Sequence, residues 1–520
     1  MVVPTADAQR DVRSRGRKAG GKLTGPLLRS GAVVVAGFVL YAGSPPRQLW
    51  WTAPLAFAVF ALTVQRRRAG AGFGYGLLFG MAFLLPLLGW LQDFLEVQFG
   101  PWPWLAVAVV EALFFGVAGA AMARVSRLPA APLWMAMVFV AAELLRSSFP
   151  FGGFPWGRLA FTQISGPYLA LASLGGTAAV TFAIALTGTG LAQLVSRLRG
   201  RGGWAVPVAC ALVPALAGLA VWPVVGTEAE AGTARVGVVQ GNAPNLGLGL
   251  LYADDVLHDN HIRQAGELAE SVEAGRLPRP DFVVLPEQVG SWRPERTDPE
   301  LSAVASRLGV PLAVGGLGVD ADGELRNRVV HWDPETGAGE QYIKQHLVPF
   351  AETIPLRPVA RLVSPFVDRF EQDMVPGDEP GVLRVANAVL GVGICYDVAF
   401  DDVFTGAVRQ GANLLVVPTN NAWYGPSEMS YQQLAMAQLR AVEHGRAVVV
   451  SSTSGVSAVV RPDGSVDHQT GLFTAEHFVS EVPLRTSETL ATKLGSVPGW
   501  LLSLGGAGAL VFTWWRPRRR

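Results

Sequence analysis

The stretch GVGICYDVAF, residues 391–400, is the key to this sequence because an apolar run from Val389 ends there on Cys395. The only other cysteine among the 520 residues is Cys210, which lies inside a hydrophobic segment. A single cysteine at the end of a buried strand, with no partner for a disulfide in the same polar region, needs an explanation. Two remain open at this point, an inert buried thiol and a reactive one.

The composition points to a membrane protein with one large polar domain. Half of the residues are hydrophobic and 16% are charged, whereas soluble proteins carry roughly 25% charged residues. The apolar residues crowd 27–225 and 494–515, and residues 226–493 have an ordinary polar content. The net charge of +1 says nothing about partners. We expect no nucleic-acid binding.

Eight segments have the length and apolar character of membrane helices, which need about 20 residues each. Seven lie before the polar domain and one follows it. They are 27–44, 49–65, 73–91, 102–123, 131–147, 167–195, 204–225 and 494–515. The predicted domains are therefore a basic tail (1–26), a helical region (27–225), the polar domain (226–493), a last helix (494–515) and a second basic tail (516–520).

Clusters of lysine and arginine fix the predicted orientation, because basic loops stay on the cytoplasmic side. With the N-terminus inside, every basic cluster falls inside, and the acidic loop 92–101 falls outside. The clusters lie at 10–22, 66–68, 124–127, 197–201 and 516–520. The polar domain is then extracytoplasmic, and the protein is a multi-pass protein of the cell (cytoplasmic) membrane. A free cysteine in that oxidising compartment is a liability unless it is used.

The polar domain has the pattern of an α/β fold whose strands are covered on both faces. Apolar strands are expected at 234–242, 282–287, 312–319, 389–395 and 413–420, with helices at 254–275 and 429–445. Two of these strands end on Glu287 and Cys395, and active sites gather at the carboxyl ends of strands. Lys344 and Glu352, in YIKQHLVPFAE, supply further candidates.

These residue types suit acyl-transfer chemistry. A carboxylate within hydrogen-bond reach can take the thiol proton, and an ammonium favours the thiolate and stabilises an oxyanion. The backbone N–H of Tyr396 is a second candidate oxyanion donor. Taken singly, Glu287 and Lys344 could also be ordinary surface residues, and Glu352 an ordinary loop acid.

The motifs LPE (285–287), KQHLVPFAE (344–352) and GVGICY (391–396) resemble the signatures of the nitrilase superfamily. The motifs VQGN (239–242), GFPW (153–156), ELLR (143–146) and TNNAWYG (419–425) narrow the resemblance to the membrane-embedded apolipoprotein N-acyltransferase family, as does RAVEHGR (440–446).

This resemblance implies an αββα sandwich with a Glu–Lys–Cys triad that forms an acyl thioester. The acyl chain would pass from a phospholipid to the α-amino group of the diacylglyceryl-cysteine of a lipoprotein, with no cofactor or metal and a monomeric enzyme. Cys395 would be the nucleophile, Glu287 the base and Lys344 the electrostatic stabiliser, with Glu352 supporting the lysine.

Two departures and several weaker candidates accompany the resemblance. Asp397 stands where the family usually has glutamate, and the tryptophan expected soon after VQGN is missing. Outer aromatic and amide side chains are candidates for lipid contact, although each could instead belong to an interfacial belt or fill the core: Phe154, Trp156, Asn421, Trp423 and Tyr424.

Three further residues carry weaker expectations. Glu143 and Arg146 are expected to pair one turn apart on a helix, and Glu111, inside a predicted span, has no assigned role.

Two rival functions remain open. One is a membrane-tethered nitrilase-type amidase, and the other is a transporter or channel with an outer domain.

Overall fold

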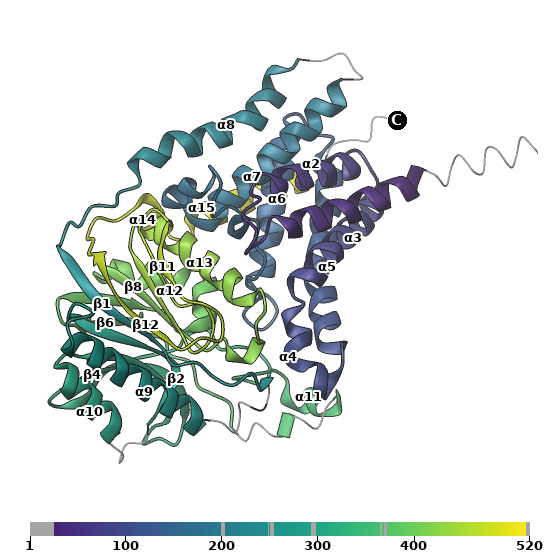
Figure 1. Ribbon diagram of the computed structural model, residues 1–520. Helices are drawn as coiled ribbons and strands as arrows, with labels where there is room; N and C mark the ends of the chain where they lie inside the picture. Colours follow the sequence, from purple (N-terminus) through teal and green to yellow (C-terminus); the bar gives the residue numbers. More distant parts are fainter. Residues whose placement is uncertain are drawn as a thin grey trace, which may run out of the picture.

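The computed structural model describes residues 25–198, 203–247, 249, 254–292, 298–363, 367–368 and 372–515. Most of the predicted basic tail (1–26) and all of the second tail (516–520) lie outside these residues. The described chain forms a helical region joined to an α/β sandwich (Figure 1).

The helical region contains six helices that are long and apolar enough to cross a membrane, counted over the described residues. They are Gly25–Ala42, α3 (Ala69–Leu87), α5 (Trp102–Val125), the stretch Leu169–Arg197 that includes α7 (Ala172–Arg197), the stretch Ala205–Val224 that includes α8 (Ala205–Val221), and α15 (Val497–Trp515). Two more predicted spans form shorter helices, α2 (Thr52–Val64) and α6 (Ala131–Arg146), of 13 and 16 residues. The predicted outer loop 92–101 is largely helical, as α4 (Trp90–Phe99).

Small residues allow the membrane helices to pack closely. A Cβ atom on Gly76 would lie 2.2 Å from the carbonyl oxygen of Phe115, and one on Gly119 would lie 2.3 Å from that of Gly72. These glycines therefore bring the backbones of α3 and α5 into contact, which is how helices gain packing energy where no hydrophobic effect drives them together.

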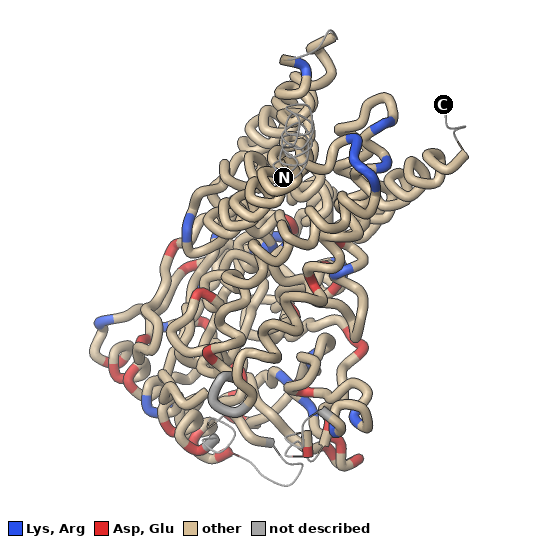
Figure 2. The backbone as a smooth tube through the Cα atoms, turned by 90° about the vertical axis from the view of Figure 1, so that its right-hand side faces the viewer, with Lys and Arg blue, Asp and Glu red and all other residues tan. Residues whose placement is uncertain are grey.

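Figure 2 shows several lysine and arginine positions toward the end of the helical region that lies away from the sandwich, and few charges along the helices in between. The backbone N–H of Arg66 donates to Ser126 at 2.8 Å, and Arg127 donates to the carbonyl of Arg67 at 2.7 Å. The loops after α2 and α5 are therefore adjacent.

The sandwich contains two six-stranded mixed sheets. The first has the order β12-β1-β2-β3-β4-β5 and the second β11-β10-β9-β8-β7-β6, each with three parallel strands at its centre. The strands of the first sheet are β1 (Thr233–Gln240), β2 (Phe282–Trp292), β3 (Leu312–Val319), β4 (Leu325–Asp333), β5 (Gly337–Ile343) and β12 (Glu476–Pro483). Those of the second are β6 (Val382–Val385), β7 (Ala388–Val392), β8 (Leu414–Thr419), β9 (Val448–Ser452), β10 (Ala458–Val460) and β11 (Val466–Gln469).

Helices cover both outer faces and complete an αββα arrangement (Figure 1). On the first sheet lie α9 (Asp254–Glu273) and α10 (Pro299–Leu308), and on the second lie α12 (Asp402–Arg409) and α13 (Met429–His444). Two shorter helices are α11 (Arg357–Val363) and α14 (Leu490–Leu494). The strands expected from the apolar runs are confirmed, because runs buried on both faces fit only the inside of such a layered fold.

The helical region and the sandwich share one hydrophobic core. A single cluster of buried side chains extends from Phe57 and Phe139 in the helices to Val442 in α13 and Val450 in β9. A second cluster fills the space between the two sheets, with Val238, Val284 and Val416 among its members. α13 is therefore buried between the second sheet and the membrane helices, where it contacts α7.

Candidate active site

The cysteine lies on a strained turn at the end of β7. Cys395 begins a short 3₁₀ helix, Cys395–Ala399, and its φ of 50° places it in the left-handed region. Such a conformation costs a non-glycine residue about 1 kcal/mol or more and persists only where the surroundings impose it. The side chain is 7% exposed. The fold therefore presents this thiol in a fixed and enclosed position.

Asp397 holds this turn in place. Its carboxylate accepts hydrogen bonds from the backbone N–H of Ile394 at 3.0 Å and of His346 at 2.9 Å, and from the hydroxyl of Tyr342 at 2.9 Å. Burial raises the pKa of Asp397, although Lys344 and the backbone donors oppose that shift. Asp397, although one methylene shorter than glutamate, therefore bonds to the backbone of its own turn at Ile394 and to the neighbouring segment at His346.

Lys344 and two glutamates form a cluster beside the cysteine. Lys344 follows β5, and Glu287 lies within β2, which does not end there as the sequence predicts but continues to Trp292. The Nζ atom of Lys344 lies 2.9 Å from Oε1 of Glu352 and 3.4 Å from Oε1 of Glu287. The other oxygen of Glu287 accepts from the backbone N–H of Asn420 at 2.8 Å. Lys344 is 1% exposed and Glu287 is 4% exposed. Burial disfavours the ammonium, but the charges of Glu352 and Glu287 outweigh it and raise the pKa of Lys344 well above its usual value.

The charges of this cluster act directly on the thiol. Burial and the charge of Glu287 raise the pKa of Cys395 to about 12, although the charge of Lys344 opposes that shift. The structure therefore brings Cys395, Glu287 and Lys344 into one buried site, as the sequence predicts. A thiol with this pKa is protonated at neutral pH and needs a base before it can attack.

Two residues of the site are not predicted by the sequence motifs. The amide of Asn327 donates to Oε1 of Glu287 at 2.7 Å and to Oε1 of Glu352 at 2.9 Å. The amide of Gln433 lies 3.7 Å from the sulfur of Cys395. Asn327 lies between two arginines in RNRVVHW, so nothing in the local pattern distinguishes it from an ordinary polar strand residue.

The predicted lipid-contact residues lie around an aromatic cluster beside the site. Trp156 is 2% exposed, donates to Oε1 of Gln432 at 2.6 Å, and packs against Trp90 and Phe154. Asn421 is buried and donates to Gln433 at 2.9 Å.

Aromatic rings of α4 extend this cluster to the loop that follows β8. Trp423 and Tyr424 are partly exposed and contact Phe94 of α4 edge-on. The hydroxyl of Tyr396 donates to the carbonyl of Gly153 at 3.1 Å. The loop between α6 and α7 thus touches the residue next to the cysteine.

The expected pair of Glu143 and Arg146 does not form. Arg146 instead donates to Glu111 at 3.0 Å and to the carbonyls of Phe154 and Trp156. The carboxylate of Glu143 accepts from Thr181 and from a backbone N–H. The loop after α6 folds back over the helix end and supplies partners that compete with the local pair.

Among the described residues, one group of side chains has the geometry for a metal ion. The ligand atoms of His258, Asp259 and Glu300 lie within 4.8 Å of one another on the outside of the sandwich. His258 is already 3.0 Å from Asp298, and the group belongs to α9 and α10, whereas the cysteine lies on the second sheet.

The fold and the site together define a class, a carbon–nitrogen hydrolase-type sandwich with a buried cysteine at its centre, fused to apolar helices. Family comparisons agree, since residues 36–190 match the apolipoprotein N-acyltransferase N-terminal domain and residues 260–492 match carbon-nitrogen hydrolase.

Relatives extend the likeness over the whole chain. An apolipoprotein N-acyltransferase of Mycolicibacterium smegmatis is 39% identical over 96% of this chain and 87% of that protein. The protein of that name from Gloeobacter violaceus is 31% identical over 92% of each. The chain belongs to the apolipoprotein N-acyltransferase family.

Two solved structures match about half of this chain. Nit3 of Saccharomyces cerevisiae is 19% identical and covers 51% of this chain and 94% of its own, with a TM-score of 0.35. An amidase from Nesterenkonia sp. AN1 is 20% identical and covers 49% of this chain and 95% of its own, also with a TM-score of 0.35.

Proposed function

We propose that this protein transfers an acyl chain from a membrane phospholipid to the α-amino group of the diacylglyceryl-cysteine at the N-terminus of a lipoprotein. The proposal rests on the observation that the helical region and the sandwich both contribute to the site. Loop residues of the helical region contact the segment that bears the thiol, through Tyr396 and Gly153, and a continuous core joins the two parts. A site built against membrane helices suits two lipid substrates.

In the first half-reaction Glu287 takes the proton of the Cys395 thiol as the sulfur attacks the ester carbonyl of the phospholipid. The oxyanion that forms lies beside the ammonium of Lys344, with the backbone N–H of Tyr396 as a second donor. Collapse of the intermediate breaks the C–O bond, and Glu287 returns the proton to the departing lysophospholipid alkoxide. The acyl chain remains as a thioester on Cys395.

In the second half-reaction the α-amine of the lipoprotein attacks the thioester. Glu287 accepts a proton from the amine and returns it to the sulfur as the C–S bond breaks, which releases the Cys395 thiol and an N-acyl product. Glu352 and Asn327 keep the side chains of Lys344 and Glu287 in position during both steps. Because a thioester is more reactive than the amide it becomes, the transfer runs downhill without a nucleotide, and no cofactor or metal takes part.

The membrane arrangement we propose has eight spans, with α2 and α6 crossing as short helices beside the six long ones. Residues 226–493 then form the extracytoplasmic domain of a multi-pass protein in the cytoplasmic membrane, and the adjacent basic loops after α2 and α5 mark the inner side. Phe154, Trp156, Asn421, Trp423 and Tyr424 line the approach of the acyl chains. The enzyme acts as a monomer.

The test uses purified full-length protein and a phospholipid with a labelled acyl chain, first without acceptor. A hydroxylamine-sensitive label on Cys395, discharged by a diacylated lipopeptide onto its amine, supports the transferase. Discharge to water but not to the lipopeptide supports a membrane-tethered amidase instead. Absence of any label on folded protein rejects the thioester mechanism, and Cys395→Ala is the matched control.

A further inference from the structure

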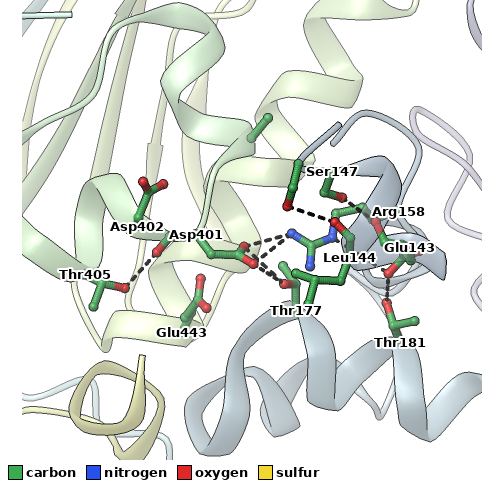
Figure 3. Close-up of polar contacts among 12 residues, drawn as sticks. Glu143, Leu144, Ser147, Arg158, Thr177, Thr181, Asp401, Asp402, Thr405 and Glu443 are labelled. Atoms are coloured by element: carbon green, nitrogen blue, oxygen red, sulfur yellow. Dashed lines mark hydrogen bonds and ion pairs between the residues drawn. The ribbon is translucent and has the colours of Figure 1, made fainter. Parts of the chain in front are cut away.

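A network of charged side chains links the helical region to the segment that follows the cysteine. Its members are buried except for Asp401, whose side chain is 37% exposed. Figure 3 shows Arg158 lying between Glu143 and Asp401, with Thr177 of α7 directed at the same aspartate. The guanidinium of Arg158 donates to both oxygens of Asp401, at 3.0 and 2.9 Å. The hydroxyl of Thr177 donates to them at 3.1 and 2.9 Å. The helical region thus holds the carboxylate of Asp401 from two sides.

Arg440 of α13 continues this network to the turn that bears the cysteine. Its Nε and Nη2 atoms donate to the carbonyls of Val398 and Ala399, each at 2.9 Å, and its Nη1 atom donates to Asp401 at 2.8 Å and to Glu443. Arg440 is fully buried. Burial alone would raise the pKa of Asp401, but the two arginines outweigh it and hold that pKa well below its usual value.

The break in α7 makes room for this contact. Gly175 and Gly176 have non-helical backbone angles, and Gly176 has a φ of 63°. A Cβ atom at Gly176 would lie 2.3 Å from a carboxylate oxygen of Glu443. Thr177 therefore begins a new helical run just where Asp401 and Glu443 approach, and the start of a helix favours negative charge.

We propose that Asp401 and Arg440 are positioning residues, which fix the turn 395–401 against the helical region and so hold the thiol of Cys395 in its reactive orientation. The turn is strained at Cys395, so contacts from neighbouring segments must stabilise it. Asp397, inside the sandwich, provides one set of contacts. The charged network that ends on Arg158 and Thr177 provides the second. Neither of these last two residues touches the site, so their effect reaches the thiol only through the turn.

This inference rests on the proposed function only in taking Cys395 as the nucleophile. A purely structural role for the network would lower the amount of folded protein and leave the folded enzyme fully active. A positioning role lowers the rate of the chemical step in protein that is still folded, because a shift of about 1 Å can cost on the order of 100-fold in rate.

Two substitutions separate charge from geometry in full-length enzyme. Arg440→Lys keeps the charge but cannot reach two carbonyls and two carboxylates at once. Thr177→Val removes one hydroxyl from the helical side and leaves every charge in place. The matched control is Glu428→Gln, which breaks a second ion pair between the helical region and the sandwich, with Arg47 at 2.6 Å, at a site away from residues 395–401.

The first readout is single-turnover labelling of Cys395 by phospholipid, over a range of donor concentrations. At saturating donor we expect the rate to fall about 100-fold in Arg440→Lys and about fivefold in Thr177→Val, while the half-saturating concentration changes less than about threefold. The control should stay within about twofold, with melting temperatures measured alongside. Saturated rates equal to wild type in folded Arg440→Lys and Thr177→Val would overturn the inference.

The second readout needs no lipid substrate. In a Cys210→Ala background Cys395 is the only thiol, and its alkylation by iodoacetamide reports its orientation and its activation by Glu287. We expect alkylation to slow about tenfold in Arg440→Lys and to be unchanged in Glu428→Gln. If wild type is alkylated but never acylated, the proposed function fails and this readout still decides the inference. Equal alkylation rates in wild type and Arg440→Lys would overturn it.

Discussion

Replacing Glu287 by glutamine should convert a pH-tolerant acylation into one that depends steeply on pH. With a pKa of about 12, roughly one Cys395 thiol in 30,000 is ionised at pH 7.5. Acylation therefore requires transfer of the thiol proton to Glu287 during attack. General bases contribute 10²–10⁴-fold, so we expect a loss of about 1,000-fold at pH 7.5, equivalent to about 4 kcal/mol.

The sign of the pH effect follows from the charges around the thiol. Burial and the charge of Glu287 raise the pKa of Cys395, and the charge of Lys344 lowers it. Glu287→Gln removes the negative charge that raises the pKa of the thiol and keeps the positive charge of Lys344 that lowers it. The pKa of the thiol therefore falls but stays above neutrality. The variant then depends on thiolate formed by solvent, and its rate should rise about tenfold per pH unit between pH 7 and 9.

Stability must be measured in parallel, because the amide cannot replace the carboxylate fully. One oxygen of Glu287 accepts from Lys344 and Asn327, and the other accepts from the backbone N–H of Asn420. A glutamine leaves one of these donors facing its own NH₂ group, at a cost of about 1–3 kcal/mol.

The assay is the time course of labelled Cys395 by intact mass at five pH values, with exposed Glu273→Gln as control. A variant that acylates within threefold of wild type at pH 7.5, or whose deficit is the same at every pH, would refute the assignment of Glu287 as the base.

Three further substitutions test contacts around the site. Gly176→Ala should lower thermal stability more than Gly232→Ala does, because both glycines have positive φ but only the first Cβ would meet a neighbour, at 2.3 Å from Glu443. Asn327→Ala should lower the acylation rate about tenfold with little change in half-saturating donor, since it removes the donor shared by two carboxylates. Trp156→Phe should cost about 1–3 kcal/mol in thermal unfolding, because it leaves a buried amide oxygen without its 2.6 Å donor, and an unchanged melting temperature would contradict this.

The sequence predicts the positions of the strands well and the contacts between distant segments poorly. The apolar runs before Glu287 and Cys395 locate β2 and β7, because strands buried on both faces read as continuous apolar runs. The expected strand ends are wrong, since β2 continues through Glu287 to Trp292, with a register shift against β3, and β7 ends at Val392. The Arg158–Asp401 contact joins residues 243 positions apart, and no local pattern encodes it. The expected pair of Glu143 and Arg146 was wrong for the same reason, since spacing along a helix takes no account of a loop that returns to it.

Hydropathy predicts where the apolar segments lie but not how long each helix is. The length of each helix depends on the tertiary contacts at its ends. Two of the eight predicted spans, α2 and α6, are shorter than 18 residues. The segment 92–101 is mostly α4, whose rings pack on the loop that holds Tyr424. Its helical structure depends on that packing partner, which lies more than 300 residues away.

The core that runs from the membrane helices into α13 also bears on how the protein is made. The sandwich follows most of the apolar helices in the sequence, so during synthesis α13 meets helices that have already been made. Gly506 of α15, which follows the sandwich, packs on Met137 of α6. Folding of the sandwich is thereby tied to assembly of the helical region, and a chain that stalls before α15 lacks the packing between α15 and α6.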